Sequence, residues 1–242
     1  MKLLPRDGIF LTYNFHKLPW KWLMVVVISI LLIYGNFILY EQLTTPSPQE
    51  AVLQGLGKSI NAQSYRYQAI AKRNLDGKET VISEIWGEKS PQGVHLNGNL
   101  PIIKANVEIF QIGDKMYRKD PLTHGWLVVA DRGKASMEQL ITELNPLGIF
   151  NLNEDITVNY AGKEKVDANT CRVYEVMTKG ENKFLELYWQ DFNYRIWVDK
   201  KDGYLRKAEV SAEHRDNSLH VLTVSITFSA YNEPIEIKAP IN

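Results

Sequence analysis

The sequence predicts a mainly β (α+β) protein in which an N-terminal transmembrane helix precedes a large curved antiparallel sheet of about ten strands. Three observations predict this class. One stretch near the N-terminus is long, apolar and uncharged, most of the remaining chain alternates apolar with polar residues, and Gly- and Asp-rich turns separate the alternating segments. The net charge is zero, which argues against the basic surface of a nucleic-acid-binding protein.

The apolar stretch is residues 22–40, which read WLMVVVISILLIYGNFILY and carry no charge. At ~1.5 Å per residue this helix spans roughly 28 Å, close to the hydrocarbon thickness of a bilayer. Trp20, Trp22 and Tyr40 lie at its two ends, where membrane helices carry aromatic residues. A buried core helix is the alternative interpretation, but core helices are rarely this long and this apolar.

The charges that flank this stretch predict its orientation. Basic residues dominate before it, whereas Glu41 and Glu50 follow it, which places the N-terminus in the cytoplasm. The segment EQLTTP lacks the small residues of a signal-peptidase site, and no lipoprotein cysteine is present there. We therefore expect an uncleaved signal anchor in a bacterial cell membrane, with a cytoplasmic tail (1–21), the anchor (22–40), a linker (41–48) and an extracytoplasmic domain (49–242).

A short helix is predicted directly after the linker. Ser47 suits the N-cap, Pro48 suits the first helical position, and Glu50 completes a capping box. The helix is expected to end near Ala62. Its apolar residues recur at helical spacing on one face: Val52, Leu53, Leu56 and Ile60.

From Ser64 onward the apolar residues recur with a period of two, which is typical of strands. Asp76-Gly77, Gly113-Asp114 and residues 200–203 supply turns. The final strand alternates most strictly, which indicates an antiparallel sheet covered on one face only. The predicted strands centre on residues 65–71, 79–88, 94–96, 105–109, 116–117, 156–160, 171–177, 194–199, 205–212 and 222–230.

Two segments interrupt the strand pattern. Residues 135–144 carry a helical stripe that ends at Pro146, and this helix is the best candidate for a lid over the hollow. Residues 183–192 (KFLELYWQDF) are rich in aromatic side chains and suit a short helix or a rim loop. Their side chains either form a satellite core or a lid that faces the membrane.

Several stretches, taken together, resemble one known family. They are SYRYQA (64–69), MYRKDPLTHGW (116–126), YAGKEKVDANTCRVYEV (160–176), YRIWVDKKDGYLRKAEV (194–210) and the closing PIEIKAP (234–240). These stretches resemble the LolA-like superfamily, which includes the lipoprotein carrier LolA, the mycobacterial LppX and LprG lipoproteins and the sensor domain of RseB. The resemblance covers most of residues 49–240.

This resemblance implies a curved antiparallel half-barrel that encloses one to three helices and an apolar cavity. Family members hold acyl chains or glycolipids there, or sense lipoprotein-like ligands, and none is an enzyme. The chain departs from the family in its anchor, because LolA is soluble and LppX-type proteins carry a lipobox cysteine. The resemblance carries no polar site residue over to this chain.

The apolar hollow is therefore the expected site, and the expected function is non-enzymatic binding or carriage of a lipid or lipoprotein acyl chain. The alternative is an envelope sensor or scaffold whose hollow is filled by side chains and whose rim docks a protein partner. Neither function requires a cofactor. The candidate cavity residues are Tyr65, Tyr67, Val107, Ile109, Leu140, Leu144, Leu222, Val224, Ile226 and Phe228.

Catalytic and metal chemistry find little support in the sequence. No Gly-x-Ser-x-Gly or His-Glu-x-x-His pattern occurs. His214 and His220 flank a predicted turn and can approach each other, but two histidines alone make a weak metal site. Asp199 and Asp202 suit turn chemistry. Cys171 is the single cysteine, which excludes an intramolecular disulfide, and we expect it to be a small buried side chain.

Overall fold

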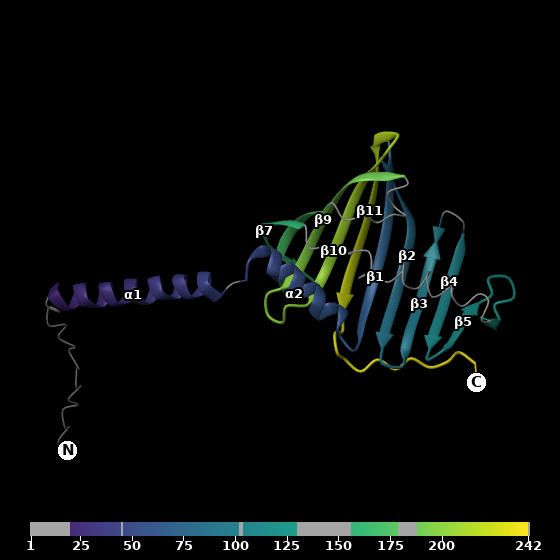
Figure 1. The fold of residues 1–242 in the computed structure, drawn as a ribbon, viewed down its shortest axis with the longest axis horizontal. Helices are drawn as coiled ribbons and strands as arrows, with labels where there is room; N and C mark the ends of the chain where they lie inside the picture. Colours follow the sequence, from purple (N-terminus) through teal and green to yellow (C-terminus); the bar gives the residue numbers. More distant parts are fainter. Residues whose placement is uncertain (1–19, 45, 102–103, 130–155, 179–187, 242) are drawn as a thin grey trace, which may run out of the picture. The chain divides into compact units, whose positions relative to one another are not determined.

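The computed structural model describes residues 20–44, 46–101, 104–129, 156–178 and 188–241 (Figure 1). The chain divides into two compact units, Met1–Pro46 and Ser47–Asn242. The predicted lid helix, with Leu140 and Leu144, lies outside the described residues.

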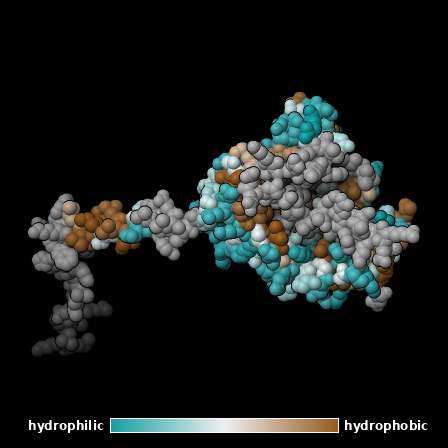
Figure 2. Space-filling view, in the orientation of Figure 1, coloured by the Kyte–Doolittle hydropathy of each residue, from teal (hydrophilic) through white to brown (hydrophobic). Residues whose placement is uncertain are grey.

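The described part of the first unit contains the helix α1 (Trp20–Thr44). Its side chains are described for residues 24–36, and the apolar ones among them are well exposed, from 48% for Val26 to 70% for Ile33. They form the hydrophobic surface along α1 in Figure 2. Within the part of the chain that the structure describes, no helix is both long enough and apolar enough to cross a membrane.

The second unit begins with the helix α2 (Pro48–Ile60), and its capping box is confirmed. The Ser47 backbone N–H donates to Glu50 Oε2 at 2.9 Å, and the Glu50 N–H donates to Ser47 Oγ at 3.3 Å. Gly55 faces the sheet so closely that a Cβ there would lie 3.2 Å from the methyl groups of Val198. The buried face of α2 consists of Ala51, Val52, Gly55, Leu56 and Ser59.

The remaining elements form one antiparallel sheet of eleven strands in the order β6-β5-β4-β3-β2-β1-β11-β10-β9-β8-β7 (Figure 1). The sheet curves but does not close, because β6 and β7 lie at opposite ends of this order. The strands are β1 (Tyr65–Leu75), β2 (Lys78–Ser90), β3 (Gly93–Leu100), β4 (Ala105–Ile112), β5 (Lys115–Lys119), β6 (Trp126–Val128), β7 (Ile156–Val166), β8 (Asn169–Thr178), β9 (Trp189–Asp199), β10 (Leu205–His214) and β11 (Asn217–Ser229).

Turn chemistry sets the register of the hairpins. Asp76 and Gly77 join β1 to β2 with positive φ at both residues, which is the backbone shape that lets two-residue loops follow the strand twist. The Asn74 side chain accepts a hydrogen bond from the Gly77 N–H at 2.9 Å. Gly113 and Gly203 also have positive φ in the predicted turns before β5 and β10. The predicted turns are therefore confirmed by the positive φ angles of Asp76, Gly77, Gly113 and Gly203.

Two details of the strand prediction are wrong. The structure adds β6, whose three residues are too few to give an alternating pattern. It also begins β9 at Trp189, so residues 189–192 are strand and not helix or rim loop. Trp189 and Gln190 pair with His214 and Glu213, and this pairing extends both strands beyond the predicted limits.

Candidate functional site

The main apolar cluster of the domain lies on one face of the sheet. We call the face that carries α2 the inner face and the opposite face the outer face. The strand registers place one apolar residue from each of eight neighbouring strands in a single row across the inner face. We call it the inner row, and its members are Tyr174, Ile196, Ala208, Ile226, Ala69, Ile85, Gly98 and Val107.

The two halves of the inner row differ in exposure. The half on β8–β11 is fully buried, with Tyr174 at 3% exposure and Ile226 at 0%. Packing of α2 accounts for this, since the helix contacts β7, β9 and β10. On β1–β4 the side chains of Ala69, Ile85 and Val107 are only partly buried, and no described helix lies over these strands in Figure 1. This second half therefore keeps apolar surface that a ligand can contact.

Most of the candidate cavity residues come together in one apolar cluster on the inner face. Its fully buried members include Tyr65, Tyr67, Ile109, Ile226 and Phe228. Val107 and Val224 pack against the cluster and stay partly exposed, and Leu222 is buried. Because fully buried side chains present little surface to a ligand, the buried members of this set act mainly as core, whereas Val107 and Val224 keep some exposed surface.

Aromatic side chains fill the inner face between β1 and β11. The Tyr65 ring lies 6.1 Å from the Phe228 ring and 5.9 Å from the Tyr231 ring, measured between centroids. The Tyr67 ring lies over Gly87 of β2, where a Cβ would come within 2.1 Å of it. Burial raises the pKa of Tyr65 to about 12, and burial likewise raises the pKa of Tyr67. Both phenols therefore stay neutral, and the cluster stays uncharged, at physiological pH.

Polar contacts hold α2 on the sheet. Lys58 donates to the carbonyl oxygen of Asp202 at 2.5 Å, and its ammonium lies 4.5 Å from the centroid of the Tyr204 ring. The buried Ser59 hydroxyl accepts a hydrogen bond from the Leu205 N–H at 2.9 Å. These contacts tie the helix to the turn between β9 and β10 and fix which half of the inner face it covers.

That turn is itself stabilised by charge. Arg206 donates to Asp199 Oδ2 at 2.9 Å and also forms an ion pair with Asp202. The Lys201 N–H donates to Asp199 Oδ1 at 2.7 Å. The predicted turn chemistry of Asp199 and Asp202 is confirmed, and the charge of Asp199 is balanced although its side chain is only 4% exposed.

Neither a protein-family model nor a curated protein matches the chain, but solved structures do. The lipoprotein LppX of Mycobacterium tuberculosis superposes with a TM-score of 0.53 at 13% identity, over 81% of this chain and 100% of LppX. LprF of Mycobacterium bovis superposes with a TM-score of 0.53 at 14% identity, over 81% of this chain and 99% of LprF. A LolA superfamily protein of Nitrosomonas europaea superposes less closely, with a TM-score of 0.32 at 11% identity, over 80% and 96%.

The second unit has a LolA-like fold. The resemblance seen in the sequence motifs is thus confirmed at the level of the fold. At 13% and 14% identity, the similarity to LppX and LprF concerns the fold alone.

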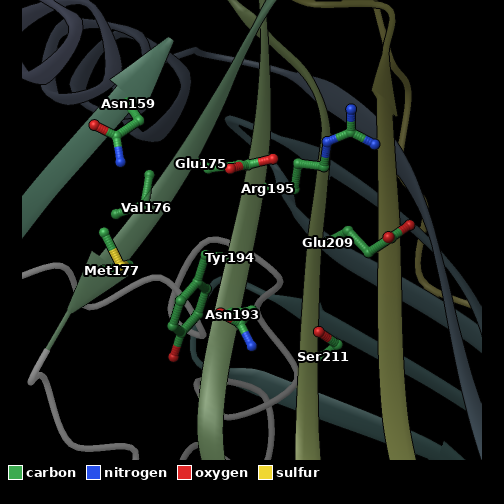
Figure 3. A pocket seen from close by; sticks show the side chains of 9 residues that line it. All are labelled: Asn159, Glu175, Val176, Met177, Asn193, Tyr194, Arg195, Glu209 and Ser211. Atoms are coloured by element: carbon green, nitrogen blue, oxygen red, sulfur yellow. The ribbon is translucent and has the colours of Figure 1, made fainter. Parts of the chain in front are cut away.

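A pocket of about 410 Å³ opens on the LolA-like domain where β8 and β9 part (Figure 3). The two strands pair only as far as Val176 and Tyr194, although β8 continues to Thr178 and β9 begins at Trp189. No local sequence pattern indicates this pocket, because its polar residues are scattered over four strands. The described lining residues are Asn159, Glu175, Val176, Met177, Asn193, Tyr194, Arg195, Glu209 and Ser211.

The described histidines of the LolA-like domain lie outside any group of three described side chains that could hold a metal ion. His214 and His220 approach each other as predicted, with ring centroids 6.2 Å apart. Within the described residues, no three His, Cys, Asp or Glu side chains are placed to hold a metal ion. His214 instead contacts the edge of the Trp189 ring at a centroid distance of 5.2 Å.

Cys171 is fully buried, as predicted, and packs with Val173 and Trp197 in a small cluster separate from the main core. Burial, with the nearby Asp199 carboxylate as a lesser cause, raises the pKa of the Cys171 thiol to about 11. Since the thiolate is the reactive form, this thiol is unreactive at neutral pH.

Proposed function

We propose that the LolA-like domain binds an apolar ligand, such as a lipid or a lipoprotein acyl chain, against the β1–β4 half of its inner face. The observation that carries this proposal is the inner row, which is apolar over eight strands but only partly buried at Ala69, Ile85 and Val107. An acyl chain gains about 0.8 kcal/mol for each CH₂ buried. No part of this function requires catalysis.

Lipid extraction from the isolated domain tests the proposal. A protease site placed between Thr44 and Ser47 would release residues 47–242 after the full-length chain has been purified, and mass spectrometry would identify lipid that leaves with the domain. We expect lipid in stoichiometric amount. Its absence would contradict the proposal and would favour the sensor or scaffold alternative.

A matched pair of variants locates the ligand. Ile85 and Ile70 lie on adjacent strands and are both partly buried, but Ile85 lies on the inner face and Ile70 on the outer. Ile85→Asn places an amide without a partner in the apolar row, where its desolvation is costly. We expect Ile85→Asn to lose the lipid and Ile70→Asn to retain it. Equal retention by both variants would contradict the assigned face.

We also propose that residues 22–40 anchor the chain in the cell membrane with the N-terminus in the cytoplasm. The support is the length, lack of charge and asymmetric flanks of this stretch. Such an anchor would keep the domain beside a source of lipid.

Single-cysteine labelling tests the topology with little background, because the one native cysteine is buried. We expect a membrane-impermeant maleimide to label Lys238→Cys in intact spheroplasts, and to label Lys2→Cys only after lysis. Wild type should stay unlabelled at pH 8 and react in urea. Labelling of Lys2→Cys in intact spheroplasts would contradict the proposal, because it would show that the N-terminus lies outside the cytoplasm.

A further inference from the structure

We propose that the pocket between β8 and β9 binds a small organic amine with a short apolar portion. This site is separate from the inner row, and it does not depend on the function proposed above. The proposal rests on three properties of the pocket, namely its open geometry, its unbalanced charge and its mixed lining.

The geometry of the split creates the space. Within the described part of the chain, Val176 and Tyr194 are the last paired residues of these two strands. Both residues line the pocket, although their side chains belong to the buried apolar cluster of the inner face. Met177 continues along β8 beside the gap and is 52% exposed. A volume of about 410 Å³ lies within the usual size of small-molecule sites.

The charges do not balance within the pocket. Glu175, Arg195 and Glu209 lie in a cross-strand row on β8, β9 and β10 (Figure 3). Two carboxylates therefore face one guanidinium, which leaves one net negative charge among the described lining residues.

The single guanidinium is already engaged outside the pocket lining. Arg195 donates to Glu164 Oε1 at 2.7 Å, and its guanidinium carbon lies 5.1 Å from the centroid of the Trp197 ring. Glu164 is held in turn by the Trp197 indole N–H at 2.8 Å. Arg195 is thus already paired with a carboxylate outside the pocket lining, whereas its Nε makes no hydrogen bond to a described residue.

Of the two carboxylates, Glu209 pairs with Lys207 at 3.0 Å. The Glu175 side chain is exposed and makes no hydrogen bond or ion pair with the described residues. An ammonium group complements the Glu175 carboxylate, because it brings three hydrogen-bond donors and a positive charge to this negatively charged acceptor. The carboxamides of Asn159 and Asn193 and the Ser211 hydroxyl supply further acceptors at the rim.

Calorimetric titration of the full-length chain in lipid nanodiscs tests the proposal, with hexylammonium as the probe and empty nanodiscs subtracted. We expect hexylammonium to bind and hexanoate to bind at least about tenfold more weakly, because the carboxylate of hexanoate would meet Glu175. Butylammonium should bind up to about fifteenfold more weakly than hexylammonium, because it buries two fewer methylene groups on Met177.

Glu175→Gln should weaken hexylammonium binding by about tenfold or more, since it removes a charge-assisted hydrogen bond. Glu84→Gln is the matched control. Glu84 lies in the same cross-strand row, five strand spacings and roughly 24 Å from Glu175. The Glu84→Gln variant should bind hexylammonium with an affinity within about twofold of that of wild type.

Three results would overturn the proposal: no hexylammonium binding to wild type, equal weakening by the two substitutions, or equal binding of hexanoate. Because Glu175 is exposed, Glu175→Gln is expected to fold normally. The lipid-extraction experiment reports on the inner row alone, so the failure of one site is distinguishable from the failure of the other.

Discussion

Arg206→Met is expected to lower the free energy of unfolding of the LolA-like domain by about 3–5 kcal/mol. The substitution leaves the Asp199 carboxylate, only 4% exposed, without the guanidinium that neutralises it at 2.9 Å. The Lys201 N–H still donates to Asp199, but one neutral hydrogen bond does not balance a buried charge. Urea unfolding followed by tryptophan fluorescence measures the change.

Two further variants show whether charge is the cause. Adding Asp199→Asn to Arg206→Met removes the buried charge and should recover part of the lost stability. Lys238→Met, which breaks the exposed ion pair with Glu236, should change the stability by less than about 1 kcal/mol. If Arg206→Met cost no more than Lys238→Met, the ion pair would not be what holds this turn.

Phe228→Ala is also expected to cost about 3–5 kcal/mol, because it removes a packed ring from the core. Phe228 is 3% exposed, and its ring lies within 6.5 Å of the Tyr65, Tyr67 and Tyr231 rings. Thr227→Ala on the outer face should stay within about 0.5 kcal/mol of wild type. Equal losses from the two substitutions would mean that β11 presents the opposite face to the core.

Local patterns predicted much of the fold. The capping box at Ser47 and Glu50 and the turn at Asp76-Gly77 depend on residues within a few positions of one another, and both are present. The strict alternation in the final strand assigned Ile226 and Phe228 to one face, and both are buried. Neighbouring residues suffice for such assignments because a helix turn or a hairpin is closed locally.

The prediction was weaker where distant residues decide the outcome. Alternation showed that Phe228 points inward, but its packing depends on Tyr65 and Tyr231, which approach it only through pairing of β1 with β11 and the turn that follows. The first residues of β9 were missed because their pairing with β10 is not encoded locally. The pocket between β8 and β9 was missed for the same reason, since Glu175, Arg195 and Glu209 meet only across three strands.

Photolabelling tests the central claim, that the β1–β4 half of the inner face holds an apolar ligand, most directly. A diazirine-bearing alkyl alcohol would be bound to the full-length chain and irradiated, and the adducts mapped by peptide mass spectrometry. We predict adducts at Ala69, Ile85 and Val107, and none at their outer-face neighbours Ile70 and Glu84. Adducts confined to the outer face or to residues 22–40 would contradict the claim.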